Sequence, residues 1–76
     1  IQSDISVAAR GLEKNSPVFY YMTDLNGALI LRGEGLADRR GDFFSAILLP
    51  GNLSAGIYVL VLESKNQTQR FKLLKK

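Results

Sequence analysis

The sequence contains no cysteine, no histidine and no tryptophan. Without cysteine, the chain forms no disulfide bonds and lacks the thiolate ligands of a zinc finger. Without histidine, it has no imidazole for a catalytic triad or for acid–base catalysis. The serines have no evident lysine partner at a useful spacing, so an activated hydroxyl nucleophile is not expected either. We therefore expect that the protein is not an enzyme.

Signatures of cofactor and metal binding are also missing. The glycine-rich stretch at residues 33–35 lacks the third glycine of a nucleotide-binding loop, and no helical pattern follows it. The spacing of Asp24, Asp38 and Asp42 does not match that of a calcium-binding loop. We therefore expect no cofactor and no metal ion.

Long apolar runs are absent, and the chain is short. The longest apolar runs have about six residues, whereas a membrane-spanning helix needs roughly 20. The 76 residues predict a single domain over 1–76, which is not membrane-spanning and is held together by apolar packing alone. Because the chain starts at Ile1 without a charged leader, we expect it to be a piece of a longer precursor.

The net charge of +3 is modest, but its distribution is uneven. Basic residues gather in a central segment and at the end of the chain: Arg32, Arg39, Arg40, Arg70, Lys72, Lys75 and Lys76. Such clusters suit phosphates, a lipopolysaccharide or an acidic protein, and they are equally typical of a solvated loop and a solvated strand end. No aromatic residues interleave with them, so a nucleic acid partner is not expected.

Short apolar segments alternate with turn signals along the whole chain. The pattern predicts strands at residues 5–8, 18–23, 28–32, 43–49, 57–62 and 68–74. Residues 33–42 hold three glycines and several charges, which predicts a mobile loop. Turn signals every 8 to 12 residues and no helical period predict an all-β fold, a small antiparallel β-sandwich of six to seven strands.

Residues 53–62 are the stretch around which the other strands are expected to pack. Gly56 precedes six apolar residues, at a point where a positive φ or a close backbone approach would require glycine. Tyr58 is expected to place its ring in the core, with its hydroxyl group bonded to the backbone of the preceding corner.

Residues 18–32 predict a β-hairpin. Asn26-Gly27 between two apolar segments indicates a type I′ turn, in which both residues have positive φ. Asp24 is expected to accept hydrogen bonds from the backbone of this turn. The strand at 18–23 is apolar on both faces, so Phe19 and Tyr21 are either covered or presented to solvent or a partner.

Three motifs occur in a particular order. They are the Asp-Leu-Asn-Gly hairpin within residues 22–30, the Gly56 to Tyr58 corner with its apolar strand at 53–61, and the Lys72 to Lys75 ending. In this order and at these distances, the set resembles the type A C-terminal sorting domain of the bacterial type IX secretion system. The resemblance covers residues 18–76, whereas residues 1–17 have no counterpart of the proline-rich opening that many members have.

The resemblance implies an immunoglobulin-like sandwich that directs a cargo protein of Bacteroidetes through the periplasm, across the outer membrane and to the cell surface or the medium. The implied partners are the translocon, its shaft proteins, the shuttle protein and a sortase-like peptidase that joins the cargo to an anionic lipopolysaccharide. We hypothesise that the docking edge consists of Lys72, Leu74, Lys75 and Lys76. The remaining motif residues, which we expect to maintain the fold, are Asp24, Asn26, Gly27, Gly56 and Tyr58.

Two other readings remain open from the sequence. The chain is alternatively a non-catalytic accessory sandwich that packs on a neighbouring domain or binds carbohydrate through Phe19 and Tyr21. The two-sided aromatic hairpin also suits self-association into a homodimer.

Overall fold

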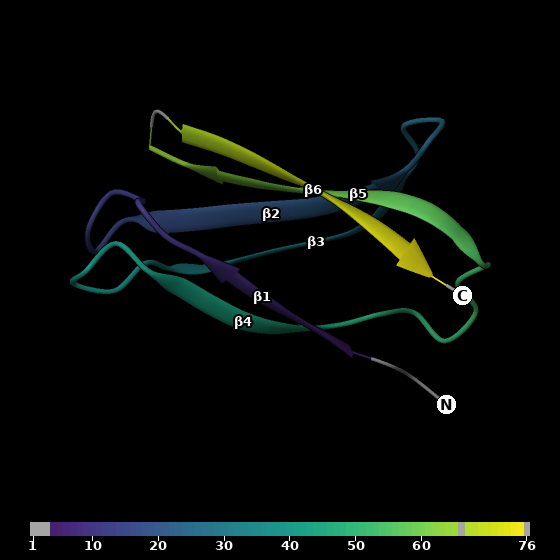
Figure 1. Ribbon diagram of the computed structural model, residues 1–76, viewed down its shortest axis with the longest axis horizontal. Helices are drawn as coiled ribbons and strands as arrows, with labels where there is room; N and C mark the ends of the chain where they lie inside the picture. Colours follow the sequence, from purple (N-terminus) through teal and green to yellow (C-terminus); the bar gives the residue numbers. More distant parts are fainter. Residues whose placement is uncertain (1–3, 66, 76) are drawn as a thin grey trace.

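All the regular structure of the described chain is β-strand. The computed structural model describes residues 4–65 and 67–75, and Figure 1 shows the course of the chain. The six strands are β1 (Asp4–Ala9), β2 (Pro17–Asp24), β3 (Leu29–Leu36), β4 (Phe43–Leu48), β5 (Gly56–Ser64) and β6 (Gln67–Lys75). Each predicted strand is therefore present. The largest difference in length is at β3, which extends four residues beyond the predicted end at Arg32, to Leu36.

The strands form two antiparallel sheets that face each other, as Figure 1 shows. One sheet pairs β1 with β4, and the other has the order β3-β2-β5-β6. The second sheet joins two hairpins, β2–β3 and β5–β6, through the pairing of β2 with β5. This arrangement corresponds to strands B and E opposite strands C′, C, F and G of an immunoglobulin domain. The predicted small immunoglobulin-like sandwich is thus confirmed.

The core lies between the sheets and consists of side chains from both. Val18 and Met22 on β2 and Leu60 and Leu62 on β5 are at most 1% exposed. The β1–β4 sheet covers them with Val7, Ala9, Phe43 and Ile47. Full burial of each large apolar side chain contributes about 1.5–3 kcal/mol, so these few residues supply much of the stability of the domain.

The corner before β5 has the predicted chemistry. Tyr58 is 7% exposed, and its hydroxyl group donates a hydrogen bond of 2.6 Å to the Ser54 carbonyl oxygen, four residues upstream. Gly56 has a φ of 154°, which side chains rarely permit, while a Cβ there would meet no atom within 4 Å. Of the two reasons proposed for this glycine, the backbone conformation therefore applies and the close approach does not. The arrangement resembles the tyrosine corner of immunoglobulin domains.

The hairpin between β2 and β3 forms, but its predicted type I′ turn is wrong. Gly27 has a φ of 86°, whereas Asn26 is not among the residues with positive φ. The Gly27 N–H donates to the Asp24 carbonyl oxygen at 3.1 Å, and the Asp24 N–H donates to the Ala28 carbonyl oxygen at 3.1 Å. The Asp24 carboxylate also accepts from the N–H groups of Asn26 (2.8 Å) and Ala28 (3.0 Å). This side-chain acceptor favours a type I turn followed by a left-handed glycine.

The predicted loop at 33–42 is wrong for residues 33–36, which belong to β3, and confirmed for residues 37–42. Its first part is β-strand because Gly33 and Gly35 face aromatic rings: a Cβ at Gly33 would collide with the Tyr20 ring, and one at Gly35 with the Phe43 ring. The two rings contact each other with their centroids 6.4 Å apart. Here glycine serves close packing within a strand rather than flexibility.

The second part of this segment repeats the hairpin turn. The Gly41 N–H donates to the Asp38 carbonyl oxygen, and the Asp38 carboxylate accepts from the N–H groups of Arg40 (2.8 Å) and Asp42 (2.9 Å). Backbone hydrogen bonds from Leu12 to Gly41 and from Asn15 to Asp38 attach the turn to the segment before β2. The turn is therefore ordered by the same carboxylate geometry as that at Asp24.

The backbone N–H groups of Asp42 and Arg40 lower the pKa of Asp38 below its ordinary value, and the Arg40 and Arg39 charges add to this effect. Because the folded-state pKa is depressed, this stabilisation is complete above the unfolded-state pKa and is lost as the pH falls through the folded-state pKa. We predict that Asp38→Ala lowers the thermal midpoint at pH 7, and that the deficit shrinks in acid. Calorimetry between pH 7 and pH 2 measures it, with Glu34→Ala as the control for losing one charge. An equal deficit at every pH would contradict the prediction.

We predict that Tyr58→Phe costs about 0.5–1.5 kcal/mol, since it removes one hydrogen bond and leaves the ring. Gly56→Ala should cost about 1–3 kcal/mol through backbone strain alone. Urea unfolding measures both. Ser54→Ala is the matched control, because the Tyr58 hydroxyl group bonds to the main chain of Ser54 and not to its side chain. A loss from Ser54→Ala as large as that from Tyr58→Phe would refute this account of the corner.

Candidate docking edge

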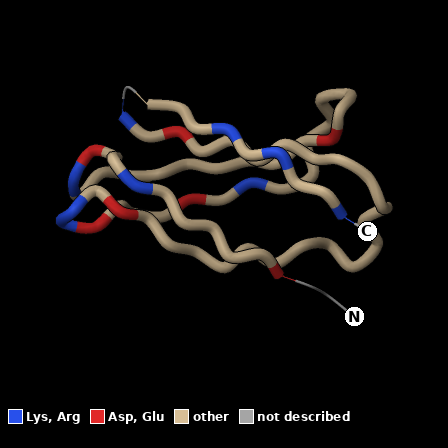
Figure 2. Tube along the Cα trace, in the orientation of Figure 1, with Lys and Arg blue, Asp and Glu red and all other residues tan. Residues whose placement is uncertain are grey.

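Strand β6 lies at an edge of the four-stranded sheet and pairs with β5 on one side. No strand among residues 4–65 and 67–75 pairs with its other side. The strand contains Arg70, Lys72 and Lys75 and no acidic residue. Figure 2 shows these basic positions spaced along it. The predicted docking edge therefore lies on an accessible margin of the sandwich.

The alternation of a strand separates the predicted docking residues. Lys72 and Leu74 lie on the outer face of the sheet, next to Val59 and Ile57, and Leu74 is 67% exposed. Lys75 belongs to the opposite face, together with Phe71 and Leu73, and is half-buried. The fourth predicted residue, Lys76, lies outside the described residues. The outer face thus combines cations with one exposed leucine, while Lys75 points elsewhere.

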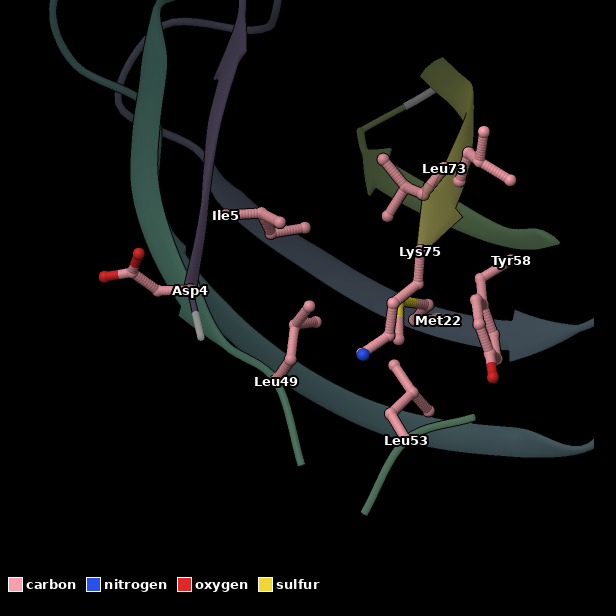
Figure 3. Close-up of a pocket in the computed structure, with 9 residues that line it drawn as sticks. Asp4, Ile5, Met22, Leu49, Leu53, Tyr58, Leu73 and Lys75 are labelled. Atoms are coloured by element: carbon pink, nitrogen blue, oxygen red, sulfur yellow. The ribbon is translucent and has the colours of Figure 1, made fainter. Parts of the chain in front are cut away.

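Lys75 extends over an apolar pocket at one end of the sandwich. The pocket has a volume of about 300 Å³ and is lined mainly by Ile5, Met22, Leu49, Leu53, Tyr58 and Leu73, as Figure 3 shows. Residues from both sheets contribute to it. The Lys75 ammonium group reaches between Leu49 and Leu53, whereas the Asp4 carboxylate points away from the pocket. The pocket therefore has an apolar lining with one residue of each charge, Lys75 and Asp4, at its margin.

A second hollow continues from this pocket along the side of the sandwich. Its volume is about 220 Å³, and its lining consists of residues 5–8 on β1 together with Leu60, Phe71 and Leu73. The two hollows share Ile5 and Leu73. At the far end, the Gln69 amide group donates a hydrogen bond of 3.1 Å to the Arg10 carbonyl oxygen. We call this open seam, between β1 at residues 4–8 and β6 at residues 71–75, the β1–β6 trough.

The trough could not be found from the sequence, because apolar periodicity marks which residues face inward and not which edges remain unpaired. Phe71 and Leu73 face inward, and both are only partly buried against the core. The two side chains are incompletely covered because no described strand lies beside β6 on that side. This follows from the order of strands in the sheets and cannot be seen in the sequence pattern.

The outer face of the four-stranded sheet presents the aromatic residues of β2. Phe19 is 50% exposed and pairs with Glu34, while the half-buried Tyr21 pairs with Arg32. A shallow hollow is lined by Phe19, Arg32 and Glu34 together with Gly33. The sequence left open whether Phe19 and Tyr21 are covered or presented to solvent. In the structure, this face of β2 is exposed.

The outer face of the β1–β4 sheet is apolar as well. Phe44 and Leu48 are each 59% exposed, and Ala8 lies opposite Phe44 in the pairing of the two strands. Ala46 lies between them along β4. This face is a second candidate contact surface, with Ser6 opposite Ala46 and Asp4 opposite Leu48 as its polar members.

The motif residues assigned to the fold act within it. Asp24 and Gly27 form the hairpin turn, in which the Asn26 N–H donates to the Asp24 carboxylate. Gly56 and Tyr58 form the corner before β5. Asn26 and Gly27 are exposed as well, so what distinguishes the β6 residues is their position on an unpaired strand edge.

Within the described ranges, no three histidine, cysteine, aspartate or glutamate side chains gather in a way that would hold a metal ion. Nor do those ranges contain a helix that would cross a membrane. Compared with known proteins, the chain matches no family model, no curated protein and no solved structure.

Proposed function

We propose that this protein is a C-terminal sorting domain of the type IX secretion system, recognised as a folded unit through the edge formed by β6. The observation that carries the proposal is the edge position and the positive charge of β6. It is an edge strand, it has three cations and no acidic residue, and its outer face exposes Lys72 and Leu74. Such an edge offers backbone hydrogen bonds to a partner strand, while its charges discourage indiscriminate pairing.

The three motifs have different structural roles, and this difference supports the proposal. Two of them, the Asp24 turn and the Gly56–Tyr58 corner, form local hydrogen bonds that fix the sandwich. The third lies on a strand edge that no described strand covers. A machine that exports many different cargos must read a feature common to all of them, and a folded sandwich with a basic edge provides one.

The partners proposed on this reading are the translocon, its shaft and shuttle proteins and the sortase-like peptidase. The domain would meet them in the periplasm, in transit to the outer membrane surface or the medium. An anionic lipopolysaccharide is a further proposed partner, since the cations of β6 complement phosphate and carboxylate groups.

Export of a fluorescent protein with this domain fused to its C-terminus, in a host with a type IX system, tests the function. We predict that the triple variant Lys72→Glu, Leu74→Ser and Lys75→Glu loses most of the export. The matched control is Arg32→Glu, Leu36→Ser and Arg39→Glu, which makes the same chemical changes on or just after β3, the opposite edge strand. Undiminished export of the β6 variant, with both variants folded by circular dichroism, would refute the proposed docking edge.

The accessory reading remains the second candidate, because a specific observation favours it. Phe19 is half exposed beside Arg32 and Glu34, an arrangement of a ring with polar groups that suits a sugar, and Phe44 with Leu48 suits a neighbouring domain. If this reading holds, Phe19→Ala should reduce retention on immobilised polysaccharides and leave export unchanged. If the sorting proposal holds, neither the protein nor the variant is retained. Sedimentation would reveal a homodimer through the same aromatic face.

A further inference from the structure

No strand of residues 4–65 and 67–75 lies along the β1–β6 trough. In immunoglobulin domains, strand A pairs with strand B at the margin of its sheet. Here β1 occupies the B position, and no strand among residues 4–65 and 67–75 pairs with its outer edge. The edge of β6 borders the same opening. Two unpaired strand edges therefore flank one apolar seam.

The dimensions of the trough suit one extended segment. At about 3.3 Å per residue, the five residues 4–8 of β1 give a length of roughly 16 Å. The base holds Leu60, which is 1% exposed, and the sides hold the partly buried Ile5, Phe71 and Leu73. The Gln69–Arg10 hydrogen bond bounds one end, and Lys75 lies at the other. Alternate side chains of an added strand would enter this apolar space.

The charges beside the trough determine which segment fits. Arg70 and Lys72 lie on the outer face of β6, so they would flank the outward side chains of a strand added there. Opposite charges in cross-strand pairs stabilise a sheet, and like charges destabilise it. Lys75 adds a positive charge at the pocket end. The inward positions of the added strand should thus be apolar and the outward positions acidic.

We propose that the β1–β6 trough binds an extended segment of a partner protein, which adds to β6 as a further strand and alternates apolar with acidic residues. This inference names the chemistry of the partner for the edge used in the proposed function, and in that respect it rests on that function. Backbone hydrogen bonds along β6 supply affinity, and the trough and the cations supply selectivity. Pairing between the β6 edges of two copies is not favoured, since it would bring Arg70 and Lys72 of one copy against the same cations of the other.

The probe is a capped nine-residue peptide in which valine and glutamate alternate. Calorimetry should detect its binding to the intact protein, and NMR should place the largest shifts of backbone amide signals in β1 and β6. We predict that Arg70→Glu with Lys72→Glu weakens this binding by about tenfold or more and improves binding of the equivalent valine–lysine peptide. The matched control, Arg39→Glu with Arg40→Glu, changes the charge equally in the distant 38–42 turn and should leave the affinity unchanged.

Three results would overturn the inference. One is equal binding of a peptide with the same composition in shuffled order, which would indicate attraction without strand addition. Another is a set of NMR shifts centred on Phe19 and Tyr21. The last is a dimer formed through β6 in sedimentation without peptide.

The peptide and export experiments fail in different ways. Loss of export in the β6 variant without peptide binding would leave the sorting function standing and overturn the strand inference. Peptide binding that depends on Arg70 and Lys72, together with no export of the unmodified fusion protein, would support the trough and overturn the sorting function.

Discussion

The pairing of β2 with β5 is the interaction on which the rest of the structure depends. Each hairpin forms between neighbouring segments, but this ladder joins residues some 35 to 45 positions apart, as in the pairs Met22–Leu60 and Tyr20–Leu62. Without it, neither hairpin has a partner to cover its apolar face, and an isolated two-stranded hairpin is only marginally stable. The β1–β4 sheet in turn packs on the surface that the ladder creates. The cohesion of the domain is therefore concentrated in two adjacent strands, and the other four depend on them.

The strands could be predicted from the sequence because apolar segments of the right length alternate with turn residues. The hydrogen bond of Tyr58 could also be predicted from the sequence. A buried hydroxyl group needs a partner, and the preceding corner supplies a nearby carbonyl oxygen. The turn at Asp24 was only half predictable. Its carboxylate acceptor was expected, but the dipeptide Asn26-Gly27 suggested a different backbone geometry, which the two hydrogen bonds to that carboxylate override.

The segment at 33–42 shows where local propensity fails. Its glycines suggested mobility, yet Gly33 and Gly35 accommodate rings from Tyr20 and Phe43, and Asp38 orders the turn that follows. The two glycine contacts depend on how neighbouring strands pack, which composition does not show, whereas the Asp38 turn is local and has the same Asp-x-x-Gly spacing as the turn at Asp24. The same limit applies to the candidate site: the cations of β6 were visible in the sequence, whereas the trough beside them depends on the order of strands in two separate sheets.

The direction in which β6 pairs has a mechanical consequence. Lys75, at its carboxyl end, pairs with Gly56 at the beginning of β5, so the hairpin opens toward the end of the chain. A pull applied there loads the hydrogen bonds one after another, as in a zipper, instead of shearing all of them together. Asp4 pairs with Leu48 in the same way, so a pull at the other terminus also peels a strand. The hydrogen bonds of β1 and β6 therefore oppose a pull at either end one at a time, and the remaining resistance to unfolding by force comes from side-chain packing between the sheets.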